Sequence, residues 1–136
     1  MVDSTARRLG MAAAFLAAAA LPAVAAPAAT AEVFTLRAEP GASWGPVTPF
    51  GTSCTYTLVA AVSTDMPVSF YDFVDSSTFV PGNLVTPVDG VATVRWTPVV
   101  PGTHRIMAYQ TSAGGPTVDI QVGTGITTGS GCAVPF

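Results

Sequence analysis

The stretch from Gly90 to Gln110, GVATVRWTPVVPGTHRIMAYQ, constrains the fold of this chain more than any other segment. It contains two runs of alternating side chains, and a period of two is typical of β-strands with one buried face. Pro98 and Pro101 separate the runs, and because proline has no amide hydrogen to donate, strand pairing must stop there. The stretch therefore predicts two strands joined by a turn. Their inward side chains are predicted to be Ala92, Val94, Trp96, His104, Ile106 and Ala108.

Short alternating segments bounded by glycine, proline and polar residues recur along the chain, and no window after the first 31 residues has a helical pattern. Further strands are expected over residues 33–38, 54–62, 68–74, 117–122 and in one or two short runs within 79–88, with a short added strand at Val47. Residues 123–131 are expected to form a flexible Gly/Thr/Ser arm that ends at Cys132. About seven strands without a crossover helix predict one all-β domain, a sandwich or barrel, over residues 32–136.

Residues 1–31 have the organisation of a secretory signal peptide. Arg7 and Arg8 precede an apolar run, MAAAFLAAAAL, which is followed by small residues with two A-x-A cleavage sites. Cleavage after Ala31 is favoured over cleavage after Ala25. An uncleaved membrane anchor is the alternative, but the run is mostly alanine and two prolines follow it, which makes it a poor membrane span. The mature chain is therefore expected to be secreted, either released or held non-covalently at the cell surface.

The charge pattern excludes nucleic acid as an expected partner. The chain has five basic residues, all arginine, and eight acidic ones. Only Arg37, Arg95 and Arg105 lie after the predicted leader, and three isolated arginines do not form the basic stripe that neutralises phosphates. Arg95 and Arg105 are expected on exposed strand faces.

Cys54 and Cys132 are the only cysteines. In an exported chain a disulfide is the expected state. Cys54 opens the second expected strand and Cys132 follows the last one, which places both at the same end of an alternating antiparallel sandwich. Two free thiols in a redox or metal role are the alternative, although no CxxC motif is present.

The segment Gly90 to Pro98, followed by Pro101-Gly102-Thr103-His104, resembles the bacterial immunoglobulin-like repeats of secreted and surface proteins. Upstream, Gly51-Thr52, Tyr56-Thr57-Leu58 and residues 68–72 (VSFYD) match the same pattern. The resemblance covers residues 45–122 and implies a single immunoglobulin-like antiparallel β-sandwich, of a class used in adhesion, spacing or carbohydrate-associated surface proteins. This chain differs from that family in having one copy rather than an array and in adding the two cysteines.

No residue pattern in the chain predicts catalysis. His104 is the only histidine, and it is interpreted as an inward structural residue rather than a general base, because no nucleophile motif accompanies it. No catalytic residue and no cofactor are therefore expected. Asp72 and Asp75, with Asp65 and Asp89 as further members, are weak candidates for calcium, although aspartate also stabilises turns through its own backbone.

An outward face made of Tyr71, Met107 and Tyr109, with Trp44 in a loop, is the candidate contact surface. The leading hypothesis is a secreted, non-enzymatic module that binds a protein or glycan partner at the cell envelope, as adhesion domains do. One alternative is a small-molecule carrier, since the enediyne-binding apoproteins resemble this chain in size and class, although their cleft motifs and second disulfide are missing here. A carbohydrate-associated accessory domain is the other alternative.

Overall fold

The computed structural model describes residue 22 and residues 32–136. The predicted signal peptide, residues 1–31, therefore lies outside the described residues apart from Pro22. Within residues 32–136 the helices and strands of the chain are strands alone, so the predicted all-β fold is confirmed. The strands are β1 (Val33–Glu39), β2 (Ser43–Trp44), β3 (Tyr56–Val62), β4 (Val68–Asp72), β5 (Ser77–Val80), β6 (Leu84–Val85), β7 (Val91–Pro98), β8 (Gly102–Tyr109), β9 (Thr117–Val122), β10 (Ile126–Thr128) and β11 (Gly131–Ala133).

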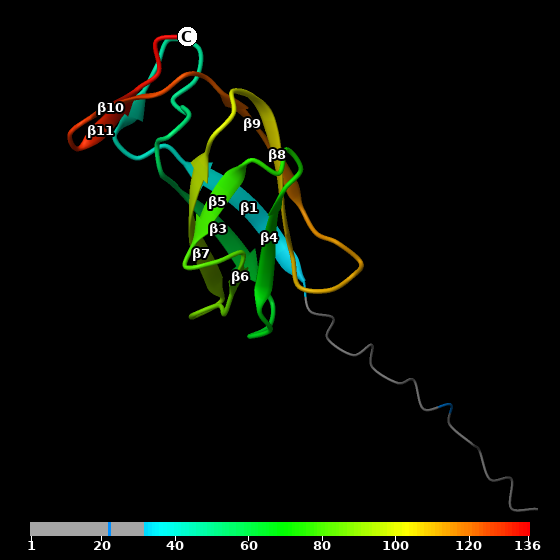
Figure 1. Ribbon diagram of the computed structural model, residues 1–136. Coiled ribbons are helices and arrows are strands. Elements are labelled where there is room, and N and C mark those ends of the chain that lie inside the picture. Colours follow the sequence, from blue (N-terminus) through cyan, green and yellow to red (C-terminus); the bar gives the residue numbers. More distant parts are fainter. Residues whose placement is uncertain (1–21, 23–31) are drawn as a thin grey trace, which may run out of the picture.

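Two four-stranded antiparallel sheets form the sandwich (Figure 1). The first sheet has the order β1-β3-β7-β5 and the second the order β6-β4-β8-β9. Strands β7 and β8, which follow each other in the chain, lie in different sheets, so the proline-bounded turn between them carries the chain across the sandwich. Pro98 is the last residue of β7 and still lies opposite Ser77 of β5, so pairing ends after this proline and not at it, whereas Pro101 lies in the turn outside both strands.

The inward alternation predicted for the strands is confirmed around Trp96, which is fully buried. Side chains from both sheets meet in one core, in which Leu58, Ala60, Ile106 and Ala108 are also completely covered. At β1 the alternation is broken, because the register with β3 shifts between Val33 and Thr35. This irregularity turns Val33 into the core and leaves Phe34 58% exposed, so the regular alternation expected for the strand over residues 33–38 does not hold at its start.

The prediction of a flexible arm over residues 123–131 is wrong, because residues 126–133 form a hairpin of β10 and β11. Strand β11 also pairs in parallel with β2. These three strands, here called the cap sheet, project from one end of the sandwich next to the C-terminus (Figure 1). Glycine here permits close packing rather than flexibility, because a Cβ atom on Gly125 would lie 2.4 Å from the Thr52 carbonyl oxygen and 2.8 Å from the Cys54 sulfur. The strand expected at Val47 is also wrong; the chain bends there, and the added strand is β2.

Two links fasten the cap sheet to the sandwich. The first is the predicted disulfide between Cys54 and Cys132, which is confirmed, with a Cα–Cα distance of 6.2 Å. The second is the Tyr56 hydroxyl, which accepts a hydrogen bond from the Gly51 amide at 2.6 Å and lies 3.0 Å from the Ser43 hydroxyl oxygen in β2. Both links start from residues at the beginning of β3, where Tyr56 is the first residue and Cys54 lies two positions before it. The cap sheet is therefore held over that end of the sandwich.

Candidate functional site

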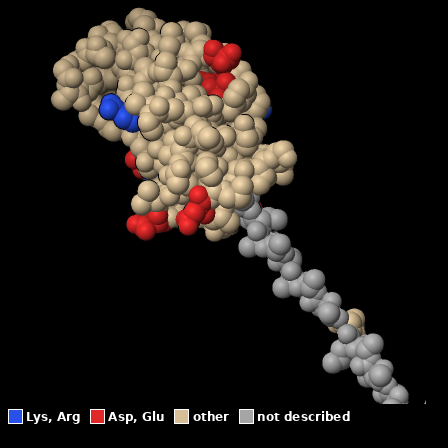
Figure 2. Space-filling view, turned by 60° about the horizontal axis from the view of Figure 1, so that its bottom comes forward, with Lys and Arg blue, Asp and Glu red and all other residues tan. Residues whose placement is uncertain are grey.

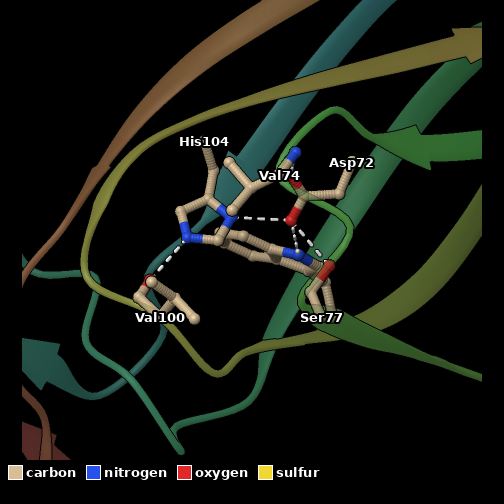
Figure 3. A network of polar contacts seen from close by, with 6 residues as sticks. Asp72, Val74, Ser77, Val100 and His104 are labelled. Atoms are coloured by element: carbon tan, nitrogen blue, oxygen red, sulfur yellow. Dashed lines mark hydrogen bonds and ion pairs between the residues drawn. The ribbon is translucent and has the colours of Figure 1, made fainter.

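A buried carboxylate, Asp72, joins the two sheets inside the sandwich (Figure 3). One of its oxygens, Oδ2, accepts hydrogen bonds from the Ser77 hydroxyl at 2.6 Å and from the Trp96 indole at 3.3 Å. The other, Oδ1, accepts a bond from the Val74 amide at 3.0 Å. Since Ser77 and Trp96 belong to the first sheet and Asp72 to the second, the carboxylate ties the sheets together through polar contacts.

His104 completes this network. Its Nδ1 lies 2.6 Å from Asp72 Oδ2 and its Nε2 lies 2.6 Å from the Val100 carbonyl oxygen (Figure 3). Both partners are acceptors when Asp72 is ionised, so the ring satisfies both contacts only when both nitrogens carry hydrogen. The ring is also fully buried. The prediction that His104 points inward is confirmed, and both of its ring nitrogens have partners within the protein.

Several contacts act on the pKa of Asp72. Burial raises it, but the hydrogen bonds from Ser77, His104 and Val74, together with the charge of His104, outweigh burial and hold the pKa below its ordinary value of 3.8. In the unfolded chain this carboxyl has its ordinary pKa, so its stabilising contribution is complete above that value. The contribution is lost as the pH falls through the lower pKa of the folded state.

We therefore expect the free energy of unfolding to decrease in acid below about pH 4, and to decrease less steeply in an Asp72→Asn variant. Urea unfolding measured at a series of pH values will check this. The matched control is Asp65→Asn. Because Asp65 is exposed, the free energy of unfolding of this variant should decrease with falling pH as steeply as that of the wild type. Equal slopes for wild type and Asp72→Asn would contradict the assignment.

The two weak calcium candidates lie in different surroundings. Asp72 is 3% exposed and already accepts the hydrogen bonds described above, whereas Asp75 is exposed at a turn with a φ of 55°. Asp65 and Asp89 are exposed as well. Within residues 32–136 no three His, Cys, Asp or Glu side chains gather as a metal site would require.

The candidate contact face forms a groove on the second sheet. Tyr71 in β4 pairs with Met107 in β8, and Tyr109 lies on the same outward face two pairs further along, opposite Ser69. Phe73 joins them, with its ring centroid 5.1 Å from that of Tyr71 in an edge-to-face arrangement. The groove has a volume of about 520 Å³, and the loop after β8 closes one side of it. The contact groove, as it is called below, is lined by Tyr71, Phe73, Met107, Tyr109, Thr111, Ser112 and Gly114.

Trp44 does not belong to the contact groove. It lies in β2 of the cap sheet and is 64% exposed, so its inclusion in one contact face with Tyr71 was wrong. Phe73 was not predicted as part of this face and was expected only near the end of the strand over residues 68–74. The signal for it was the pattern of Tyr71, Asp72 and Phe73, in which the two aromatic residues share one side of the chain and the aspartate takes the other.

Charged side chains are sparse on the surface, and the face shown in Figure 2 carries only scattered ones. Arg105 makes a two-pronged pair with Asp119, with Nε and Nη2 2.7 and 2.9 Å from the carboxylate oxygens. Arg37 pairs with Glu39 at 3.1 Å. Arg95 is exposed, and no acidic side chain within residues 32–136 pairs with it. These arginines lie apart from one another, so they form no basic stripe on the described surface.

Comparison with protein-family models and with curated proteins found no match for this chain. In the described residues no helix has the length and apolar character needed to cross a membrane. The disulfide is consistent with an extracellular protein.

Proposed function

We propose that this chain is a secreted, non-enzymatic immunoglobulin-like domain that binds a partner protein at the cell envelope through the contact groove. The strand orders β1-β3-β7-β5 and β6-β4-β8-β9 support the immunoglobulin-like part of the proposal. The observation that carries the binding part is the convergence of Tyr71, Phe73, Met107 and Tyr109 in one groove. Aromatic residues and methionine are enriched at the centres of protein interfaces, where they bury large areas at low entropic cost.

The exposure of the groove favours a protein partner over a small ligand. Tyr71 is 44% exposed and Phe73 is 50% exposed, so the aromatic walls remain largely open to solvent. Typical small-molecule sites cover about 70–90% of the ligand surface. An open groove with exposed aromatic walls is better suited to a side chain or loop presented by another protein surface.

We expect Tyr71→Ala to weaken partner binding by about 10- to 100-fold, which is the effect of removing an aromatic residue from the centre of an interface. The measurement begins with a photo-crosslinking residue at position 73, which should capture the partner from native envelope material. The dissociation constant of the captured partner is then measured for the wild type and the variant.

Phe34→Ala is the matched control, because Phe34 is a similarly exposed aromatic residue on β1 of the other sheet. It should leave the dissociation constant unchanged. A partner whose affinity falls equally in both variants, or in neither, would count against the contact groove.

A small-molecule carrier remains the second candidate because the groove volume of about 520 Å³ lies within the range of small-molecule sites, about 300–1,000 Å³. Mass spectrometry of organic extracts from the natively produced protein distinguishes a small-molecule carrier from a protein-binding module. A carrier would release a stoichiometric apolar compound that is absent from the Tyr71→Ala variant, whereas a protein-binding module would release none.

A further inference from the structure

A second, polar cleft lies beneath the cap sheet, between the cap hairpin and the outer face of the first sheet. Its volume is about 350 Å³. Hydroxyl groups and glycine backbone line most of it, together with one arginine and one glutamate. The residues that matter for its chemistry are Ser53, Thr55, Thr57, Thr127, Ser130, Arg95 and Glu39. It is called the cap cleft below.

The walls of the cap cleft are held in place before any ligand arrives. The disulfide between Cys54 and Cys132 forms part of the lining and fixes the hairpin to the end of the sandwich. The Thr55 hydroxyl lies 2.7 Å from that of Thr97, and the Ser53 amide donates to the Pro98 carbonyl at 2.9 Å. A site whose walls are already ordered loses little entropy when it binds.

Arg95 supplies the positive charge of the cap cleft. In the sheet it lies opposite Thr57, which in turn lies opposite Glu39, so Arg95 and Glu39 are two strands apart, about 10 Å. Glu39 is instead held by Arg37 on its own strand at 3.1 Å. Whereas the other two arginines of the described chain are paired with carboxylates, the guanidinium of Arg95 is available to an anion from solution.

We propose that the cap cleft binds a saccharide unit that carries one carboxylate. The guanidinium of Arg95 holds the carboxylate by a two-pronged hydrogen-bonded pair, the geometry in which these two groups fit best. The hydroxyls of Ser53, Thr57 and Ser130 each donate and accept hydrogen bonds, as the hydroxyls of a sugar do. This site is separate from the contact groove, since Arg95 lies in the first sheet and Tyr71 in the second.

Charge distinguishes a carboxylate from a phosphate in this cleft. One guanidinium balances one negative charge, and Glu39 in the same lining repels a second. A dianionic phosphate would therefore be left with an excess of negative charge, whereas a neutral sugar would leave Arg95 without a partner. A monoanionic sugar acid satisfies both the cation and the hydroxyl groups.

Titration of the isotope-labelled protein with D-glucuronate, followed by amide NMR shifts, tests the proposal. We expect shifts centred on residues 55–57 and 127–131 with a dissociation constant on the order of 1 mM, as is usual for so small a ligand. D-glucose, which lacks the carboxylate, and inorganic phosphate, which lacks the sugar, are each expected to bind at least about tenfold more weakly.

Arg95→Gln is expected to weaken glucuronate binding by about tenfold or more, while Arg105→Gln, the matched control on the other sheet, leaves it unchanged. Thr57→Val, which removes a hydroxyl and keeps the shape, should weaken binding severalfold and gives a second test in case Arg95→Gln disturbs the fold. The proposal is overturned if glucuronate causes no shifts in these segments, if phosphate or glucose binds equally well, or if both Arg95→Gln and Thr57→Val bind as the wild type does.

Discussion

Replacement of both cysteines, in the variant Cys54→Ala/Cys132→Ala, is expected to lower the free energy of unfolding by about 4.5 kcal/mol. The disulfide joins residues 78 positions apart, so it restricts most of residues 32–136 in the unfolded chain. The chain-entropy relation for a loop of that length gives about 4.5 kcal/mol at 25 °C. Domains of this size have net stabilities of about 5–15 kcal/mol, so the loss removes a large part of the total. Thermal and urea unfolding of the variant and the wild type will measure it.

The loss should be largest locally in the cap sheet. Without the disulfide, the cap sheet keeps its non-covalent contacts with the sandwich, among them the Tyr56 hydroxyl beside Ser43 and the buried Val134 side chain. Amide hydrogen exchange in residues 126–133 is therefore expected to rise more than exchange in β7 or β8. Reduction of the wild type should reproduce both effects, which separates loss of the bond from any effect of the alanines. A stability loss below about 1 kcal/mol would mean that the cap sheet docks without its covalent link.

The sandwich itself could be predicted because burial alternates along strands. Trp96, Val94 and Ala92 occupy every second position, and so do Ile106 and Ala108, all of them buried as expected. This pattern depends only on local geometry, since successive side chains of a strand point to opposite faces. It predicts which side of a strand is buried, but not which strands become neighbours, and so it could not show that β10, β11 and β2 form a third sheet.

The cap sheet was missed for a second physical reason. Glycine-rich segments are interpreted as flexible because glycine has the widest conformational freedom. The same absence of a side chain also allows two backbones to touch, as Gly123 and Gly125 do against Phe136 and Thr52. A sequence does not distinguish these two uses of glycine, because the contacts involve residues about 10 to 75 positions away in the chain.

Asp72 illustrates how a polar residue can be misplaced by a rule that is correct on average. Aspartate near a strand end is usually a turn residue, so Asp72 was grouped with Asp75 as a weak calcium candidate. It continues the inward positions of Val68 and Phe70, however, and is buried with them. His104 and Trp96 are also inward residues with polar groups that need a partner. Three such residues on inward positions were the available signal for a buried polar network.

Asp72→Ala is expected to destabilise the fold by about 3–5 kcal/mol, because removing one member of a buried ionic network leaves the others without partners. His104 Nδ1 would lose its partner, and the Trp96 indole and Ser77 hydroxyl would lose their acceptor. Asp65→Ala, an exposed aspartate, should change stability by less than about 0.5 kcal/mol and is the control. Urea unfolding of the two variants will measure the difference.

A double-mutant cycle with His104→Gln tests whether the cost arises from the network. We expect a coupling of about 1.5 kcal/mol or more between positions 72 and 104, since they share a buried hydrogen bond of 2.6 Å. Additive effects would instead attribute the loss to a cavity. Because Asp72 lies between Tyr71 and Phe73, loss of its bond to the Val74 amide should also release the turn that positions Phe73 in the contact groove. Partner binding is therefore expected to weaken in Asp72→Ala even at temperatures where the variant remains folded.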